Sequence, residues 1–311
     1  MKNRYLFQPT INGWGSWGEI YCSIPAFSLL IREIYQKEKL EADEINNLTP
    51  GTNAVFRCGK YVIKIYAPLE SGMDSARDFQ IERSLLQFVP QLGINAPKLI
   101  ASGEYLDRYC FPYLVMDYVE GMEAGEVLAN YSRKRKVEVV RQIKEMLETL
   151  HRPAGEIPEL PEIDLKKQAV NNSRLKKLGR ELANDLKKRA ASIQISDPVL
   201  VHGDITGENV LISPEGNLVF LDFADAHIAP PCYELPPLLF ELFQFDRELV
   251  EEWVETDERE AFFDILMDGL ALHDFGPDII LSFLSKRNIS PLEVRSLEDF
   301  RRILIGCLER R

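Results

Sequence analysis

The sequence predicts an α+β protein with a strand-rich N-terminal part and a helix-rich C-terminal part. Strand-like runs flank a glycine turn between residues 54 and 65 and recur between residues 109 and 119. From residue 137 onward, apolar residues take helical spacing instead. Two short apolar segments, 199–201 and 218–223, bracket a polar loop inside this helical part. That loop carries the chemistry.

Composition bounds the class of protein. The chain has 311 residues, of which 45% are apolar and 28% charged, which is ordinary for a folded protein of one large or two smaller domains. The net charge of −12 argues against a nucleic-acid partner, because such proteins carry a basic face for phosphates. An acidic chain is compatible with a cationic small substrate.

The N-terminal elements follow from periodicity. Residues 27–35 place apolar side chains at helical spacing and predict an early helix whose role is packing. Residues 54–65 predict a hairpin that turns at Gly59 and Lys60. Residues 78–92 return to helical spacing, and residues 109–119 form a run rich in aromatic and branched residues that predicts a strand.

The C-terminal elements are mainly helical. Residues 137–151 predict a long helix with one apolar face. Residues 166–191 predict a second helical region, whose many lysines and arginines are interpreted as a solvated face. Between the strand-like segments 199–201 and 218–223, residues 214–217 predict a turn.

Cysteine usage and the first residues of the chain indicate a cytoplasmic protein that neither enters nor spans a membrane. The five cysteines are scattered and odd in number, so they predict neither a disulfide framework nor a zinc cluster and are interpreted as reduced core thiols. Residues 1–10 are polar, and no apolar run is long enough to cross a bilayer.

The polar loop contains a pair of residues suited to phosphoryl transfer. His202-Gly203-Asp204 is followed by Asn209, five positions after the aspartate, between apolar strand residues. Phosphoryl transfer needs a carboxylate that accepts the proton of the acceptor hydroxyl, and an oxygen ligand for a metal. Asp204 is predicted to be the catalytic base and Asn209 a magnesium ligand. Alone, His-Gly-Asp could equally be an ordinary tight turn.

A second carboxylate ends the following strand. Asp222 follows the apolar run 218–221 and is itself followed by Phe223, Ala224 and Asp225. Magnesium takes few protein oxygens and completes its shell with phosphates and water. Asp222 is therefore predicted to hold Mg²⁺ together with Asn209.

These motifs resemble the aminoglycoside phosphotransferase and choline kinase branch of the kinase-like enzymes, whose catalytic loop reads His-Gly-Asp, four residues, Asn. The resemblance covers roughly residues 50 to 275. It implies a two-lobed protein-kinase-like fold, with a small antiparallel-sheet nucleotide-binding lobe over residues 1–116, including an N-terminal helical extension. A larger helical catalytic and substrate lobe would span residues 117–311.

The resemblance also implies nucleotide contacts in the N-terminal part. Lys64 resembles the strand lysine that pairs with nucleotide phosphates, and Glu82 looks like its ion-pair partner on the next helix. Main-chain groups of Asp117, Tyr118 and Val119 would meet the adenine edge. The bound nucleotide would be ATP, with GTP also possible.

The phosphate loop departs from the protein kinase pattern. Residues 49–56 hold one glycine, Gly51, where protein kinases have three. Main-chain amides and the side chains of Thr52 and Asn53 would then have to bind the phosphates. In addition, residues 205–208 stand where many members carry a histidine or a basic residue, so the acceptor contacts are not defined.

Finer features look nearest to the hygromycin phosphotransferases. They are residues 50–53 ahead of the lysine strand, Val201 before the His-Gly-Asp motif, and residues 272–275. Family acceptors bind in the helical lobe, where acidic residues follow Asp225. A cationic acceptor could be held there by carboxylates, and the predicted contacts are Asp225, Glu234, Glu241 and Asp274.

The predicted function is transfer of the γ-phosphate of ATP or GTP to a hydroxyl of a small cationic acceptor such as an aminoglycoside or aminocyclitol antibiotic, by a monomer or homodimer. Choline, homoserine or another small alcohol is the alternative acceptor. A non-catalytic nucleotide-binding regulatory pseudokinase is the alternative of another class. A protein kinase is disfavoured, because the three-glycine loop is missing and no activation segment follows Asp222. The same resemblance implies a structural role for His202, which would pack near the loop backbone rather than contact substrate.

Overall fold

The computed structural model describes residues 5–49, 51–152, 156–254 and 259–309. The chain divides into two compact units. Unit 1 comprises Met1–Glu120 and Phe223–Asp225, and unit 2 comprises Gly121–Asp222 and Ala226–Arg311. Within the described ranges, no helix combines the length and apolar composition needed to cross a membrane.

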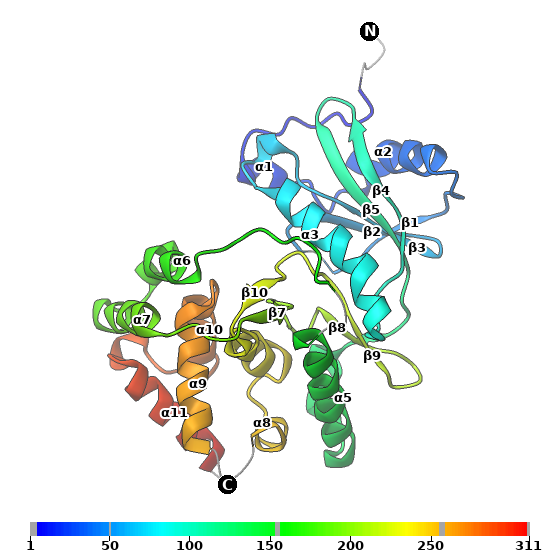
Figure 1. The fold of residues 1–311 in the computed structure, drawn as a ribbon. Helices are drawn as coiled ribbons and strands as arrows, with labels where there is room; N and C mark the ends of the chain where they lie inside the picture. Colours follow the sequence, from blue (N-terminus) through cyan, green and yellow to red (C-terminus); the bar gives the residue numbers. More distant parts are fainter. Residues whose placement is uncertain (1–4, 50, 153–155, 255–258, 310–311) are drawn as a thin grey trace. The chain divides into compact units, whose positions relative to one another are not determined.

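Unit 1 is built on a five-stranded antiparallel sheet in the order β1-β2-β3-β5-β4 (Figure 1). Its strands are β1 (Ile45–Asn47), β2 (Ala54–Cys58), β3 (Tyr61–Ile65), β4 (Leu99–Leu106) and β5 (Cys110–Asp117). The predicted hairpin is confirmed, because β2 pairs with β3 around Gly59, whose φ of 62° lies in the region that glycine tolerates. The helices are α1 (Trp14–Gly18), α2 (Ile24–Lys37) and α3 (Ser75–Phe88).

The two faces of this sheet carry different helices. Side chains alternate along β5, and Phe111, Tyr113 and Val115 join a core with the buried face of α2. The predicted packing role of that early helix is confirmed. On β3, Ile63 and Ile65 join the same core, so Lys64 points to the opposite face. That is the face on which α3 lies.

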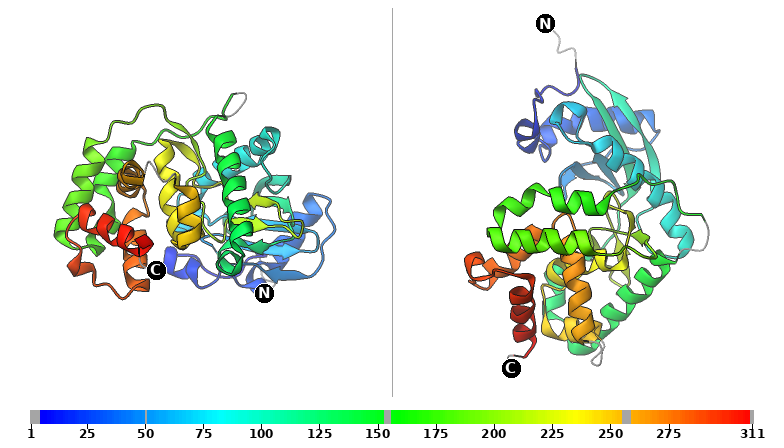
Figure 2. Two further views of the ribbon diagram at one scale, coloured as in Figure 1. Left: turned by 90° about the horizontal axis from the view of Figure 1, so that it is seen from below. Right: turned by 60° about the vertical axis from the view of Figure 1, so that its left-hand side comes forward.

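Unit 2 is mainly helical (Figure 2). Its helices are α4 (Ala124–Val127), α5 (Arg133–His151), α6 (Leu165–Asn171), α7 (Arg180–Ser192), α8 (Arg247–Trp253), α9 (Arg259–Leu272), α10 (Gly276–Lys286) and α11 (Leu297–Glu309). The predicted helical region 166–191 is thus two helices, because Asn172 ends α6 and caps a 3-10 turn at Ser173–Lys177.

Short strands in unit 2 hold the polar loop. They are β6 (Met122–Glu123), β7 (Val199–Val201), β8 (Val210–Ile212), β9 (Leu218–Phe220) and β10 (His227–Ala229). β7 pairs with β10, and β6, β8 and β9 form a three-stranded sheet. The polar loop therefore runs from the end of β7 to the start of β8.

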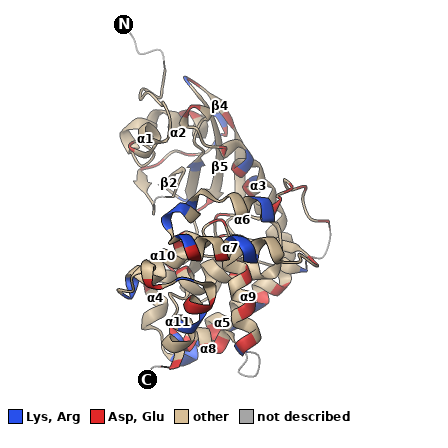
Figure 3. Cartoon of the chain, turned by 90° about the vertical axis from the view of Figure 1, so that its left-hand side faces the viewer, with Lys and Arg blue, Asp and Glu red and all other residues tan. Residues whose placement is uncertain are grey.

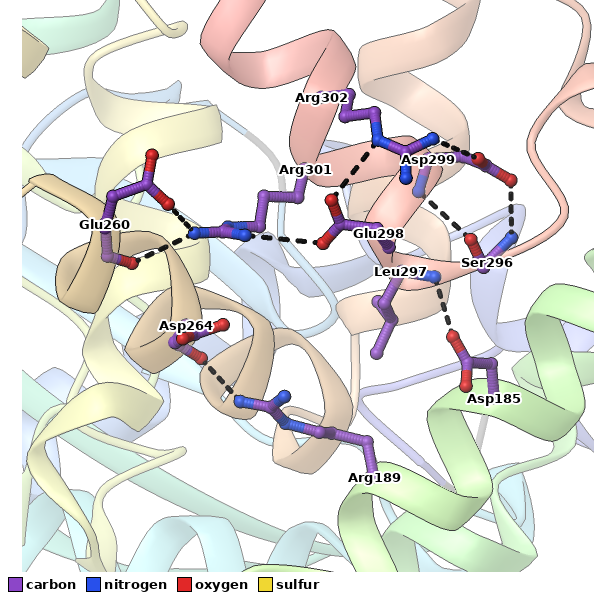
Figure 4. Close-up of polar contacts among 10 residues, drawn as sticks. All are labelled: Asp185, Arg189, Glu260, Asp264, Ser296, Leu297, Glu298, Asp299, Arg301 and Arg302. Atoms are coloured by element: carbon purple, nitrogen blue, oxygen red, sulfur yellow. Dashed lines mark hydrogen bonds and ion pairs between the residues drawn. The ribbon is translucent and has the colours of Figure 1, made fainter.

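Polar contacts join α11 to its neighbours in unit 2 (Figure 4). Arg301 of α11 pairs with Glu260 of α9, and the Leu297 amide donates to Asp185 of α7 at 2.8 Å. These contacts fix the C-terminal helix against the helical core.

The prediction of core thiols is wrong for two cysteines. Cys58 is buried, but Cys22 and Cys110 are exposed. Cys110 begins β5 at the end of a hairpin, where its side chain leaves the core.

Candidate active site

Lys64 and Glu82 form a buried ion pair within unit 1. The Lys64 Nζ lies 2.6 Å from Glu82 Oε2, and the two residues are 4% and 2% exposed. The Tyr66 hydroxyl also donates to Glu82 Oε2. Because Lys64 and Tyr66 are two positions apart, they share the face of the sheet that meets α3. The structure thus brings together the predicted pair and adds Tyr66, which the sequence analysis did not single out.

The turn before β2 is braced by its own side chains. Gly51 and Thr52 are exposed, whereas Asn53 is 5% exposed and its Oδ1 accepts from the Ala67 amide at 3.1 Å. The Thr52 carbonyl accepts from Trp17 Nε1 at 2.9 Å. The Asn53 side chain therefore braces the turn through its Oδ1, and its role in binding phosphate stays a prediction. Residue 50, part of the predicted loop, lies outside the described residues.

The segment after β5 carries the predicted adenine contacts. The Asp117 amide donates to the Lys98 carbonyl at 3.1 Å, and the Tyr118 amide donates to the Lys60 carbonyl at 2.9 Å. These two N–H groups are engaged within unit 1. For the Val119 N–H, no acceptor is found among the residues that the structure describes. The contact of this segment with adenine stays a prediction.

Asp204 and Asn209 meet in the loop between β7 and β8. Gly203 has a φ of 83°, which turns the chain directly before Asp204. The Asn209 Nδ2 donates to the Asp204 carbonyl at 2.9 Å and to Asp204 Oδ2 at 2.8 Å. With its amide nitrogen turned toward Asp204, Asn209 directs its Oδ1, a hard oxygen donor, the other way.

Asp222 lies two residues after the end of β9 in a strained conformation. Its φ of 54° is unfavourable for a residue with a side chain, and such strain gathers at functional sites. The preceding amide, that of Leu221, donates to the Asn209 carbonyl at 2.8 Å. This bond holds the end of β9 against the loop. One carboxylate and one amide oxygen fit the small hard-donor set that Mg²⁺ takes from a protein.

His202 and His273 brace the backbone of the loop. His202 Nε2 lies 2.9 Å from the Leu221 carbonyl, and the Asp204 amide donates to its Nδ1 at 3.3 Å. His273 Nε2 lies 3.0 Å from the Gly203 carbonyl, and the Phe275 amide donates to its Nδ1 at 3.1 Å. Each pattern requires a neutral ring protonated at Nε2.

Burial keeps these rings neutral. It lowers the pKa of His202 below its usual value, and it lowers the pKa of His273 to about 4. Both are structural supports of the loop, as was expected for His202.

The Glu234 carboxylate anchors the same loop through two of its main-chain amides. It is 1% exposed, and its two oxygens accept from the amides of His202 at 2.5 Å and Gly203 at 3.1 Å. Burial alone would raise the pKa of Glu234, but the nearby His151 ring, whose Nε2 lies 3.9 Å from Oε1, and the bonds from the loop lower it below the usual range. Both oxygens thus hold the backbone that presents Asp204, and the substrate contact of Glu234 stays a prediction.

Two glycines allow α4 to touch the loop. The Gly125 amide donates to the Gly207 carbonyl at 3.0 Å. A Cβ on Gly207 would lie 2.6 Å from Gly125 Cα, too close for any side chain. Gly207 was seen only as a departure from the family pattern, and its role is this close contact between two backbones.

The remaining predicted acceptor contacts have different surroundings. Asp225 is exposed. Glu241 lies on the π-helical turn Pro237–Leu242, 3.8 Å from Lys286 Nζ. Asp274 lies 3.5 Å from Arg174 Nε. Glu241 and Asp274 are thus paired with cations of the chain itself.

Comparison with solved structures defines the fold. Aminoglycoside 2'-phosphotransferase-IIIa in its GDP complex is 20% identical, with a TM-score of 0.60 over 89% of this chain and 98% of its own. A thermostable mutant of aminoglycoside phosphotransferase APH(4)-Ia is 14% identical, with a TM-score of 0.58 over 90% and 99%. Choline kinase LicA from Streptococcus pneumoniae is 18% identical, with a TM-score of 0.53 over 89% and 98%.

The fold is therefore the two-lobed α+β fold of small-molecule kinases, as predicted. The profile of the phosphotransferase enzyme family matches residues 51–273, which is most of the chain. This chain belongs to the phosphotransferase enzyme family, and the predicted resemblance is confirmed. No curated protein sequence matches it significantly. The finer likeness to the hygromycin phosphotransferases stays a prediction.

Proposed function

We propose that this protein transfers the γ-phosphate of ATP or GTP to a hydroxyl of a small acceptor. The observation that carries the proposal is the Asp204–Asn209 pair, in which a carboxylate and a metal-suited amide are joined at 2.8 Å on one braced loop. Family membership supports the same reaction type. Solved relatives were determined with GDP, AMP or ATP, which favours a nucleotide donor.

In the proposed reaction, Asp204 orients the acceptor hydroxyl for in-line attack and accepts its proton. Lys64, fixed by Glu82, pairs with nucleotide phosphates, and Val119 meets the adenine edge. Asn209 and Asp222 would hold Mg²⁺, which neutralises charge on the phosphates when it is bound. The neutral rings of His202 and His273 keep the loop rigid, so Asp204 is oriented before substrate binds.

Aminoglycosides and aminocyclitols are the acceptors that the sequence favours. One solved relative was determined with GDP and kanamycin and another with streptomycin and ATP, and a choline kinase shares the fold. Choline and homoserine are the alternatives. A cytoplasmic location and a monomeric or homodimeric state remain predictions.

The test is nucleotide turnover with magnesium across aminoglycosides, aminocyclitols, choline, homoserine and neutral sugars. One acceptor class should raise turnover above the acceptor-free rate, and Asp204→Ala should abolish the rise. If nucleotide binds, no acceptor stimulates turnover and Asp204→Ala behaves like wild type, the catalytic proposal fails and a regulatory nucleotide-binding module replaces it.

A further inference from the structure

Unit 2 contains a cavity of about 590 Å³ whose size suits a small molecule. One side is formed by Gln168 and Asn171 of α6, and the next by Ser173, Arg174 and Lys177 of the following 3-10 turn. Asp274, at the start of the segment before α10, completes the lining together with Asn172.

Hydrogen bonds connect this cavity to the catalytic loop. The Asn172 Nδ2 donates to the Asp274 carbonyl at 2.6 Å. The residue before Asp274 is His273, whose ring lies 3.0 Å from the carbonyl of Gly203, the neighbour of Asp204. Asp274 in the lining is therefore linked, through the ring of the preceding residue, to the loop that carries the proposed base.

The charges in the lining do not suit a polycation. The lining has two cations, Arg174 and Lys177, and one acid, Asp274. Arg174 lies 3.5 Å from Asp274 and 2.5 Å from Asp278, and Lys177 lies 2.7 Å from Asp278. The two cations and the two acids thus neutralise one another, and the Asp274 carboxylate is already paired, so this lining is poorly suited to hold an ammonium group. Figure 3 shows further basic residues along α7, next to this region.

The rest of the lining suits hydroxyl groups. Gln168 and Asn171 are amides and Ser173 is an alcohol, so each carries both a donor and an acceptor. The Asn171 Nδ2 also donates to the Lys167 carbonyl at 2.8 Å, which leaves its Oδ1 and its second N–H for a ligand. The Asn172 side chain is already engaged by Asp274 and Arg174. Hydroxyl groups donate and accept in the same way, whereas an ammonium group only donates. A neutral molecule with several hydroxyls therefore matches this lining better than a polyamine.

We infer that this cavity is the acceptor subsite and that its acceptor is a neutral polyhydroxylated compound of the sugar or polyol class. The inference rests on the proposed phosphotransfer and departs from the cationic acceptor expected from the acidic composition. The acceptor would present one hydroxyl to Asp204 while its other hydroxyls bond to the amides of α6.

The experiment compares two acceptor panels in the nucleotide turnover assay with the full-length protein. The neutral panel holds pentoses, hexoses and inositol, and the cationic panel holds kanamycin, hygromycin B and choline. With the best neutral acceptor, Asn171→Ala should raise the acceptor KM about 3- to 10-fold, which corresponds to one lost hydrogen bond. Asn184→Ala, an exposed asparagine on α7, is the matched control and should leave that KM within about twofold.

The outcomes separate this inference from the proposed function. Stimulation by a neutral compound, with the Asn171→Ala effect, supports both. Stimulation by the cationic panel alone overturns the polyol class but leaves phosphotransfer standing. Asp204-dependent hydrolysis that no neutral compound raises also overturns the inference. If wild type and Asp204→Ala turn over nucleotide at the same rate with every compound, both the inference and the proposed function are overturned.

Discussion

At the scale of the residue, the account depends on buried charges that are already paired. Lys64 and Glu82 lie 2.6 Å apart with almost no exposure, so removing either side chain would leave the other charged and buried without its partner. The resemblance to the kinase-like enzymes was enough to predict this pair. The role of Tyr66 could not be predicted, because an aromatic residue two positions from a strand lysine is ordinary in a sheet.

Replacing Lys64 separates its role in stability from its role in nucleotide binding. Lys64→Met should lower the free energy of unfolding by about 3–5 kcal/mol, because it leaves Glu82 charged and buried. It should also raise the nucleotide KM roughly 10- to 100-fold, as expected for a lost charge-assisted contact. Urea unfolding and steady-state kinetics measure the two effects.

The double variant Lys64→Met/Glu82→Met is the control for this prediction. It should recover most of the stability, since no buried charge is left alone, and should remain defective in nucleotide use. Recovery of the nucleotide KM in the double variant would contradict the assignment of Lys64 to phosphate binding.

Glu234 provides a second test at this scale. Glu234→Gln keeps the shape but can accept with only one oxygen, so one of the two loop amides loses its partner. We expect a loss of about 1–3 kcal/mol in unfolding free energy and a lower kcat, with the nucleotide KM little changed. Glu241→Gln, at a partly exposed residue paired at 3.8 Å, should leave both quantities close to wild type. Equal behaviour of the two variants would refute the anchoring role.

The anchor was not predictable from sequence. Glu234 stands 30 residues after Asp204 among several acids, and nothing in its neighbours marks it as the buried one. From the sequence it was therefore predicted to contact the acceptor, as were Asp274 and Glu241. Only folding shows which acids face the loop, which face cations of the chain and which face water.

At the scale of the element, the catalytic loop is held by the helices and turns around it. Two neutral histidines, a buried carboxylate and a glycine contact fix its backbone. The strands that bracket the loop could be predicted from their apolar runs. β6 and β10 could not, because neither is a continuous apolar run: β6 is Met-Glu and β10 is His-Ile-Ala.

The histidines make the stability of this element depend on pH. Burial lowers the pKa of His273 from 6.5 to about 4, and it lowers that of His202 in the same direction. Between these pH values the unfolded chain binds a proton that the folded chain does not, so stability present above pH 6.5 is lost as the pH falls toward 4. His273 alone should contribute roughly 3 kcal/mol of this loss.

Unfolding in urea at several pH values between 7.5 and 4.5 measures this dependence. His273→Gln keeps a donor for the Gly203 carbonyl but does not titrate, so its stability should fall less steeply with acid than that of wild type. Identical slopes for the two proteins would show that His273 does not resist protonation.

The contact between Gly207 and Gly125 gives a steric prediction. Gly207→Ala places a methyl group 2.6 Å from Gly125 Cα, and the loop or α4 must move. We expect a loss of about 1–3 kcal/mol in unfolding free energy together with a reduced kcat. Gly306→Ala, with open space around the added methyl, is the matched control and should have no such effect. Full activity in Gly207→Ala would contradict the tight packing of α4 on the loop.

At the scale of the whole molecule, the sequence was sufficient to predict the class and the family. The order of lysine strand, glutamate helix, His-Gly-Asp loop and second aspartate is specific, because each residue type falls on the element that its chemistry needs. The acceptor was not predictable in the same way. The net charge of −12 suggested a cationic acceptor. Many acids, however, form ion pairs with cations of the chain itself, as Asp246 and Glu248 do with buried Lys136.

The most direct test of phosphotransfer is to follow the transferred phosphate itself. Incubation with γ-labelled nucleotide, magnesium and the stimulating acceptor should give a labelled acceptor phosphomonoester with wild type. Asp204→Asn should keep nucleotide affinity and form this product about 10²- to 10⁴-fold more slowly, the usual contribution of a general base. Product formation at the wild-type rate by Asp204→Asn would contradict the assignment of the base, and the absence of any labelled acceptor with wild type would contradict phosphotransfer.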